Sequence, residues 1–297
     1  MAKIAAAVQE AVARRRASGG PGGVTPRVIA RGEGWSAADV LCTSGPADRS
    51  FEEQHSHWTI ALVVAGTFQY RTARRALMTP GSMLLGTCGQ CYECGHEHGV
   101  GDRCVSFWYA PEHFERLAAD AGWRGDRGLF AAGRLPPVRA LSPLAVRVAR
   151  GLVAPQALAW DELAIELAAN VVQVAGGINP PATRPPVNAE ARVTGIVRAI
   201  DREIRAGSAG SLSLAALSRR AALSPWHFLR TFERVTGVTP HQYILRARLR
   251  RAALRLCDEP ARVLDIALEA GFGDASNFNR AFRAEFGVSP RMYRRLA

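Results

Sequence analysis

The chain has 297 residues, a formal net charge of +12 and 48% hydrophobic residues, and six of its residues are cysteines. This length allows two hydrophobic cores, and no apolar run approaches the ~18 residues that a membrane-spanning helix needs. The N-terminal residues lack the charge order of a secretory signal. The cysteines are therefore expected to be reduced thiols of a cytoplasmic protein, acting as ligands or sensors rather than as disulfides.

The first hundred residues predict a tail followed by short strands. Residues 1–23 combine alanines with Arg14, Arg15 and Arg16, and they are expected to form a mobile tail or a short amphipathic helix. From about residue 24 to 110, apolar runs alternate with glycine and proline, which is typical of a small β-sandwich or barrel. The clearest of these runs are residues 58–71, 83–85 and 105–109.

Four cysteines and two histidines fall within residues 88–104, between these strands. Thiolates and imidazoles at such spacings can converge on one ion, and zinc is the usual ion for mixed Cys/His ligands. The expected ligands bracket a glycine-rich loop and are Cys94, His96, His98 and Cys104, with Cys88 and Cys91 as alternatives. Three other interpretations stay open: an iron–sulfur cluster, a thiol redox switch, or surface histidines beside buried thiols.

Helical patterns and a linker follow the strands. Residues 112–122, 141–153 and 160–174 have apolar residues at helical spacing and are expected to pack in the first domain. Residues 176–189 contain two glycines and four prolines, which remove hydrogen-bond donors and restrict their neighbours. This stretch is expected to be a stiff, exposed linker between two domains.

The last third of the chain contains an internal repeat. Seven positions between Phe228 and Tyr243 recur exactly 50 residues later, between Phe278 and Tyr293, which indicates a duplicated unit. Each copy has the pattern of a helix, a tight turn and a second helix. Residues 243–257, between the copies, are expected to form one long helix that holds the two units apart.

The second helix of each copy has an aromatic face and a polar face. Phe228 and Phe232 share the face that is expected to be buried, as do Phe278 and Phe282 in the second copy. The polar faces carry the arginine, histidine and asparagine side chains that a major-groove recognition helix needs. Residues 188–297 contain 19 arginines against 10 acidic residues, a net charge of +9, which favours binding to a phosphate backbone.

Four motifs in this segment, Leu223-Ser-Pro, Gly237-Val-x-Pro, Gly271-Phe-Gly-Asp and Phe286-Gly-Val-Ser-Pro, accompany the repeat. Together they make residues 190–297 resemble the DNA-binding domain of AraC/XylS-type transcriptional regulators. The resemblance implies two helix-turn-helix units bound to adjacent major grooves of double-stranded DNA. The positions that it implies for base reading are Trp226, His227, Arg230, Thr231, Arg234, Ser276, Asn277, Asn279, Arg280 and Arg283.

The same family implies an N-terminal sensor domain with a cupin-like barrel and helices that form a dimer interface. His55, His57 and Pro80-Gly81 resemble cupin motifs, and the two histidines are candidates for lining a ligand pocket. No glutamate follows His57 at the usual cupin spacing, so a cupin metal centre is not expected there.

The sequence therefore predicts an α+β multidomain protein: a tail at 1–23, a cupin-like β-barrel sensor and dimerisation domain with accessory helices at 24–175, a linker at 176–189, and an all-α DNA-binding domain at 190–297. The expected function is a homodimeric, sequence-specific transcriptional regulator with a metal- or redox-responsive sensor, and RNA polymerase is a further expected partner. The alternatives are a regulator that senses a small organic ligand and a metal-thiolate enzyme of the alkyl-acceptor DNA-repair type. No nucleophile elbow, phosphate loop or carboxylate pair is visible in the sequence, so we do not expect an enzyme.

Overall fold

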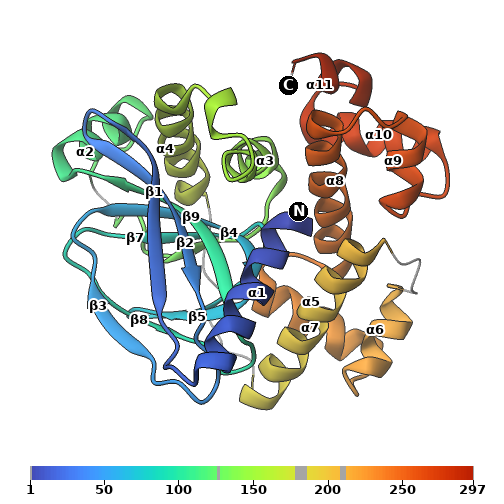
Figure 1. The fold of residues 1–297 in the computed structure, drawn as a ribbon, viewed down its shortest axis with the longest axis horizontal. Coiled ribbons are helices and arrows are strands. Elements are labelled where there is room, and N and C mark those ends of the chain that lie inside the picture. Colours follow the sequence, from blue (N-terminus) through green and yellow to red (C-terminus); the bar gives the residue numbers. More distant parts are fainter. Residues whose placement is uncertain (1, 126–127, 178–185, 208–211, 297) are drawn as a thin grey trace. The chain divides into compact units, whose positions relative to one another are not determined.

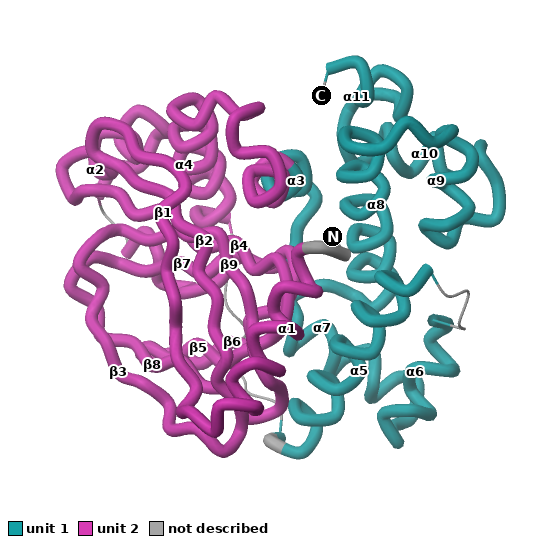
Figure 2. The backbone as a smooth tube through the Cα atoms, viewed as in Figure 1, with its two compact units in different colours: residues 1, 137–146, 185–297 teal, residues 2–136, 147–184 magenta. Residues whose placement is uncertain are grey.

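The computed structural model describes residues 2–125, 128–177, 186–207 and 212–296. It divides into two compact units, coloured separately in Figure 2. The N-terminal unit comprises Ala2–Pro136 and Arg147–Arg184, and the C-terminal unit comprises Pro137–Val146 and Pro185–Ala297. This division differs from the predicted domain boundary because it assigns residues 137–146 to the C-terminal unit. The central part of the predicted linker, residues 178–185, lies outside the described residues.

The N-terminal unit contains two antiparallel sheets (Figure 1). The larger sheet has six strands in the order β1 Val24–Gly32, β2 Trp35–Cys42, β9 Asp102–Tyr109, β4 Trp58–Gly66, β7 Met83–Gly86 and β10 Arg134–Leu135. The smaller sheet has four strands in the order β3 Phe51–Gln54, β8 Cys91–Gly95, β5 Phe68–Arg71 and β6 Arg75–Met78. The strands predicted at 58–71, 83–85 and 105–109 are confirmed.

Burial explains the place of each strand in its sheet. Residues 58–65 of β4 are all buried, as expected of an apolar run in the middle of a sheet, whereas β1 lies at the edge and is largely exposed. Val63 of the larger sheet and Tyr70 of the smaller sheet belong to one core cluster, so the two sheets face each other. In the described residues the strands stay in these two sheets and do not close into one barrel. The expectation of a cupin-like β-barrel is therefore corrected to two facing sheets with helices.

Three α-helices of the N-terminal unit accompany these sheets: α1 Ala2–Ser18, α2 Pro111–Asp120 and α4 Trp160–Gly176. Helix α3 Ser142–Arg150 contains the boundary between the two units, which falls after Val146. Helix α1 packs against β4 and β9, and its residues Ile4, Val8 and Val12 are buried. Of the two expectations for residues 1–23, the short helix is confirmed over Ala2–Ser18, and the mobile tail is wrong there because one apolar face of this segment is covered by the sheet. Within the described ranges, no helix combines the length and the apolar character that crossing a bilayer would need.

The C-terminal unit contains seven α-helices between Val187 and Leu296 (Figure 1). They are α5 Val187–Ala206, α6 Leu214–Arg220, α7 Pro225–Thr236, α8 Pro240–Asp258, α9 Val263–Glu269, α10 Ala275–Phe286 and α11 Pro290–Leu296. Helix α8 is the predicted long helix and lies between the two copies of the repeat in the sequence. Figure 1 shows α7 and α10 toward opposite ends of α8.

A buried carboxylate joins α5 to α8. The Asp201 side chain accepts hydrogen bonds from the Tyr243 hydroxyl at 3.1 and 3.2 Å. Burial raises the pKa of Asp201 to about 6, and the charge of Arg205 and the Tyr243 hydrogen bond only partly oppose this rise.

We expect this carboxyl to make the C-terminal unit less stable as the pH rises. The pKa of Asp201 is higher in the folded chain than in the unfolded chain, so its contribution is fully present below about pH 4 and is lost as the pH rises through about 6. Asp201→Asn keeps an oxygen acceptor for Tyr243 but has no proton to lose. It should therefore abolish a change of about 2–3 kcal/mol in the free energy of unfolding over this pH range. Denaturant unfolding of both proteins at several pH values measures it, and parallel profiles would contradict the prediction.

Candidate nucleic-acid interface and a buried cysteine–histidine–aspartate cluster

The two helix-turn-helix units are α6–α7 and α9–α10. Polar side chains cap the starts of three of their helices: Ser213, Ser224 and Asp274 each accept a hydrogen bond from the backbone N–H three residues later. Gly237 and Gly287 end α7 and α10 in the left-handed region, at φ values of 80° and 79°. Equivalent start and stop signals therefore give the two recognition helices the same length.

The left-handed position inside the turn is occupied by different residues in the two units. Ala222, after α6, has a φ of 50°, whereas Gly271, at the corresponding place after α9, has a φ of 87°. A side chain in this left-handed region costs roughly 1–2 kcal/mol, which glycine avoids at the cost of a more flexible unfolded chain.

We expect Ala222→Gly to raise the free energy of unfolding by about 0.5–1 kcal/mol, and Gly271→Ala to lower it by about 1 kcal/mol. The reason is that the first unit has a residue with a Cβ where the second has glycine. Denaturant titrations followed by the circular dichroism of the helices measure both changes. If both substitutions changed the free energy of unfolding in the same direction, backbone strain would not be the main cause of the changes.

The aromatic faces of α7 and α10 are buried and their polar faces are exposed. Phe228, Phe232, Phe278 and Phe282 are fully buried, which confirms the predicted inner faces. The side chains on the outer faces are exposed, or half-buried in the case of Arg234: Trp226, His227, Arg230, Arg234, Ser276, Asn277, Asn279, Arg280 and Arg283. Thr231 is 4% exposed, because it lies three residues after Phe228 on the inner face. The prediction that Thr231 reads bases is therefore corrected.

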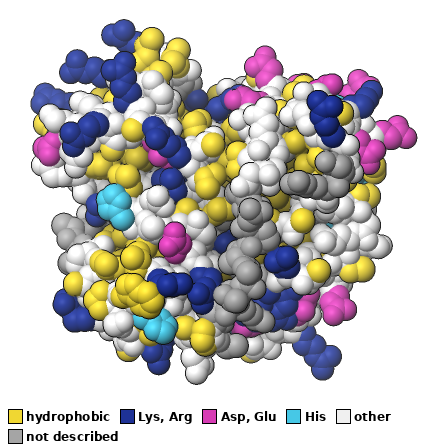
Figure 3. All heavy atoms as spheres, turned by 180° about the vertical axis from the view of Figure 1, so that it is seen from behind, with side chains coloured by type: hydrophobic (Ala, Val, Ile, Leu, Met, Phe, Trp, Pro, Cys, Tyr) yellow, Lys and Arg dark blue, Asp and Glu magenta, His cyan; other side chains and the backbone are white. Residues whose placement is uncertain are grey.

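Two local contacts orient exposed side chains on these faces. The Arg230 guanidinium lies over the Trp226 ring, 4.8 Å from its centroid, although Trp226 itself is 67% exposed. On α10, Arg280 donates a weak hydrogen bond to the side-chain oxygen of Asn277 at 3.4 Å. Each recognition helix thus presents an arginine at the same repeat position, held by a neighbour one turn earlier. Figure 3 shows many other Arg side chains on the same unit.

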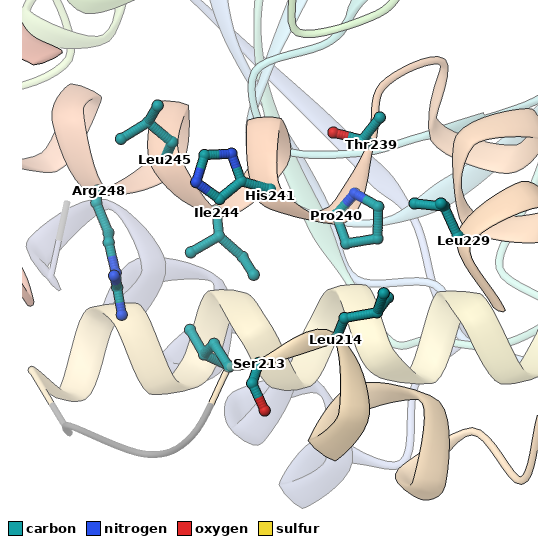
Figure 4. Close-up of a pocket in the computed structure, with 10 residues that line it drawn as sticks. Ser213, Leu214, Leu229, Thr239, Pro240, His241, Ile244, Leu245 and Arg248 are labelled. Atoms are coloured by element: carbon teal, nitrogen blue, oxygen red, sulfur yellow. The ribbon is translucent and has the colours of Figure 1, made fainter. Parts of the chain in front are cut away.

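A groove of about 560 Å³ lies between the start of α6 and the first half of α8 (Figure 4). Its walls are mostly apolar, with Leu214, Leu229 and Ile244 among the lining residues, and His241 and Arg248 are polar groups at its edge. The groove lies within the C-terminal unit and involves none of the residues predicted to read bases.

In the N-terminal unit, the structure brings Cys42 together with two potential ligands, His96 and Asp102, that lie far from it in the sequence. Cys42 ends β2, Asp102 begins β9 directly opposite it in the sheet, and His96 follows β8. One ligand atom from each lies within 4.8 Å of the other two, and all three side chains are buried. Such a group of thiol, imidazole and carboxylate is a suitable set for a transition metal ion.

Hydrogen bonds define the state of the histidine in this cluster. His96 Nε2 lies 2.7 Å from Asp102 Oδ1, and the Cys104 thiol lies 3.5 Å from Asp102 Oδ2. Burial alone would lower the pKa of His96, but Asp102 and, after it, Cys42 outweigh burial and raise this pKa to about 9. His96 Nδ1 is buried and has no hydrogen-bond partner in the described part of the chain.

The residues predicted as metal ligands are only partly brought together. Cys94 and Cys104 are buried in one core cluster, and burial raises the pKa of both thiols. His98 is half-buried, with Nε2 3.7 Å from a carboxylate oxygen of Glu97. The alternatives, Cys88 and Cys91, are half-buried and exposed. The structure thus retains His96 from the predicted set and adds Cys42 and Asp102, which sequence reasoning missed.

The two histidines predicted to line a ligand pocket differ in burial and in the residues that they contact. His55 is buried, bonded to the Tyr70 hydroxyl at 2.8 Å and stacked on Tyr92 with ring centroids 4.0 Å apart. Burial lowers the pKa of His55 to about 4, which keeps the ring neutral. His57 is exposed and contacts Ser56. Lining of a ligand pocket by His55 stays a prediction, whereas His57 lies away from this aromatic cluster.

Comparison with known proteins places the repeat in a family. Residues 217–296 match the model of a helix-turn-helix domain family. The chain is 40% identical over 85 residues to the transposon Tn10 TetD protein of Escherichia coli, and 36% identical over 91 residues to the HTH-type transcriptional regulator Rv1931c of Mycobacterium tuberculosis. These segments cover 29% and 31% of this chain, and 62% and 35% of those proteins. The matches therefore span less than two thirds of these relatives.

A solved structure is also similar over the same unit. The DNA-binding domain of AdpA, solved in complex with a target DNA, has 25% sequence identity and a TM-score of 0.33, covering 35% of this chain and 91% of that chain. On the sequence match, the C-terminal unit of this chain belongs to the AraC/XylS-type helix-turn-helix family, as the repeat and its motifs predicted.

Proposed function

We propose that this chain is a transcriptional regulator that binds double-stranded DNA through α7 and α10, placed in successive major grooves. The observation that carries the proposal is the pair of recognition helices, alike in length and capping, with exposed arginine and asparagine side chains on their outer faces. Helix α8 has 19 residues and is therefore about 28 Å long, close to the roughly 34 Å of one DNA turn.

The net charge of the C-terminal segment and its sequence similarity to named proteins support this proposal. The net charge of +9 on residues 188–297 suits a phosphate backbone. One relative is named a transcriptional regulator, and another, 39% identical over 84 residues, is named the right origin-binding protein of Escherichia coli. We infer a regulatory role for this chain rather than an enzymatic one.

The test is selection of bound sequences from a pool of randomised duplexes with the full-length protein. A regulator of this kind should enrich one site and bind it at least about 10³-fold more tightly than random DNA at physiological salt. Affinity for random DNA should fall steeply with salt concentration. Enrichment of no sequence, or equal affinity for the enriched and random duplexes, would refute sequence-specific binding.

We propose that the N-terminal unit is a sensor domain. Its facing sheets and buried thiol, imidazole and carboxylate groups support a metal- or redox-responsive signal, with zinc as the expected ion. A small organic ligand that enters near His55 is the alternative signal. The proposal includes homodimerisation through the helices of this unit, contact with RNA polymerase and a cytoplasmic location. Helix α4 carries an exposed Ile165, 47% exposed, which suits a dimer interface.

The alkyl-acceptor alternative needs a metal-bound thiolate that a DNA substrate can reach. Cys42, Cys94 and Cys104 are each less than 9% exposed, so none of these thiols offers such access. The burial of these three thiols favours a sensory or structural role over methyl transfer, and exposed Cys91 lies outside the Cys42–His96–Asp102 group.

A further inference from the structure

We propose that Cys42, His96 and Asp102 bind one transition metal ion of the zinc class, with Cys104 as the adjacent fourth donor. This inference deepens the proposed sensor role by naming the ligands. Cys42 and Asp102 are paired across β2 and β9 of the larger sheet, and His96 follows β8 of the smaller sheet. The site therefore connects the two facing sheets.

The distances fit an ion with a small adjustment. The three ligand atoms lie within 4.8 Å of one another, and the Cys104 sulfur lies 3.5 Å from Asp102 Oδ2. Bond lengths of about 2.0–2.3 Å in a tetrahedral zinc site place neighbouring ligand atoms about 3.5 Å apart. Around the ion, the widest of these separations would shorten by about 1.3 Å, and the His96 Nε2–Asp102 Oδ1 pair, now 2.7 Å apart, would widen by about 0.8 Å.

The burial of all three side chains suits an ion that is held away from water. Cys42, His96 and Asp102 are 4%, 5% and 5% exposed. His96 Nε2 lies 2.7 Å from Asp102 Oδ1, so the imidazole and the carboxylate already converge on one position. On binding, the Cys42 thiol and the protonated His96 ring each release one proton to solvent, and the thiolate and the Asp102 carboxylate offset the two positive charges of the ion.

The loop that carries this site lies under α1. A Cβ on Gly101 would meet the side chains of Val8 and Val12 at 2.9 Å, so α1 packs directly on the residue before Asp102. Arg103, one residue beyond Asp102, donates a hydrogen bond to the Ile4 carbonyl oxygen at 3.2 Å. An ion that draws Asp102 toward Cys42 would therefore change the packing of α1. The packing of this helix would then depend on whether the site holds an ion.

The experiment is a titration of the metal-free full-length protein with Co²⁺ and then Zn²⁺, followed by the thiolate-to-cobalt absorption and by metal analysis. We expect about one ion per chain in the wild type. Cys42→Ser and His96→Ala should weaken binding by at least tenfold, and Asp102→Asn by about 10–100-fold. Cys91→Ser and His98→Ala are the matched controls from the cysteine-rich stretch and should bind as the wild type does.

Three results would overturn this assignment: no stoichiometric ion in the wild type, an unchanged affinity in Cys42→Ser, or loss of the ion in His98→Ala. Because a core substitution can unfold the domain, a second measurement uses the wild type alone. In urea just below the unfolding transition, where the buried Cys42 thiol becomes transiently accessible, zinc should slow the alkylation of Cys42, as read by mass spectrometry, and leave the reactivity of exposed Cys91 unchanged. Equal alkylation of Cys42 with and without zinc would also contradict the proposal. Affinity for random DNA, measured on the same samples, shows separately whether the DNA-binding proposal holds.

Discussion

Replacing Arg103 with methionine is expected to lower the free energy of unfolding of the N-terminal unit by about 3–5 kcal/mol. Arg103 and Asp39 are 8% and 7% exposed, and they form two parallel hydrogen bonds of 2.8 Å across β2 and β9. Burial alone would raise the pKa of Asp39, but the hydrogen bonds from Arg103 and Arg27 outweigh it and lower this pKa. Without Arg103, the Asp39 carboxylate would remain buried beside Arg27 alone, whose side chain is 67% exposed.

The double variant Asp39→Leu/Arg103→Met distinguishes an unpaired charge from lost packing. If the loss comes from the unpaired carboxylate, the double variant should regain most of the stability. Arg14→Met is the surface control, since its side chain is 73% exposed, and it should leave the unfolding curve unchanged. Thermal and denaturant unfolding measure all three variants. If Arg103→Met were as stable as the wild type, the Arg103–Asp39 pair would not stabilise the N-terminal unit.

Replacing both Arg230 and Arg280 with alanine is expected to cost about 2–6 kcal/mol of binding to the selected DNA site, and each single substitution about 1–3 kcal/mol. Each arginine lies exposed at the same position of its recognition helix, where a bidentate bond to guanine is the usual contact. The two losses should be nearly additive because the residues lie on different helices.

Lysine at the same positions separates base reading from phosphate contact. Arg230→Lys and Arg280→Lys keep the charge but lose the planar fork that pairs with guanine. They should lose affinity for the selected site and keep the affinity for random DNA, as measured by fluorescence anisotropy at fixed salt. Arg14→Ala, in the N-terminal unit, is the control for general charge. Equal losses on selected and random DNA in the alanine variants would mean that both arginines contact only phosphate.

The DNA-binding unit was predictable because its signals are local. The N-caps at Ser213, Ser224 and Asp274, the glycine stops and the apolar spacing act within one or two helical turns, and the structure shows helices that begin and end at them. The error at Thr231 was one of assignment to a face. Thr231 lies three residues after Phe228, and it is therefore buried with the inner face of α7, which packs against α5 and α8.

The buried cluster was only partly predictable because strand register determines it. Cys42 and Asp102 become neighbours when β2 pairs with β9, and nothing close to either residue in the sequence signals this pairing. Within the cysteine-rich stretch, successive residues of β8 point to opposite faces, so exposed Cys91 and buried Cys94 are separated despite their proximity in the chain. The density of cysteines indicated the region correctly, but spacing alone did not identify the ligands.

The predicted tail and barrel failed for a related reason. An alanine-rich segment with three arginines resembles a mobile tail until a sheet covers Ile4 and Val8. Short strands separated by glycine and proline are compatible with a barrel or with two facing sheets, because closure depends on pairing between strands far apart in the chain.

The central claim is that α7 and α10 read successive major grooves, and a hydroxyl-radical footprint of the full-length protein on its selected site tests it most directly. We expect two protected patches on one face of the duplex, about one helical turn of 10–10.5 base pairs apart. Arg230→Ala should weaken one patch and Arg280→Ala the other. A single patch, or two patches that weaken together with either substitution, would contradict binding by two separate recognition helices.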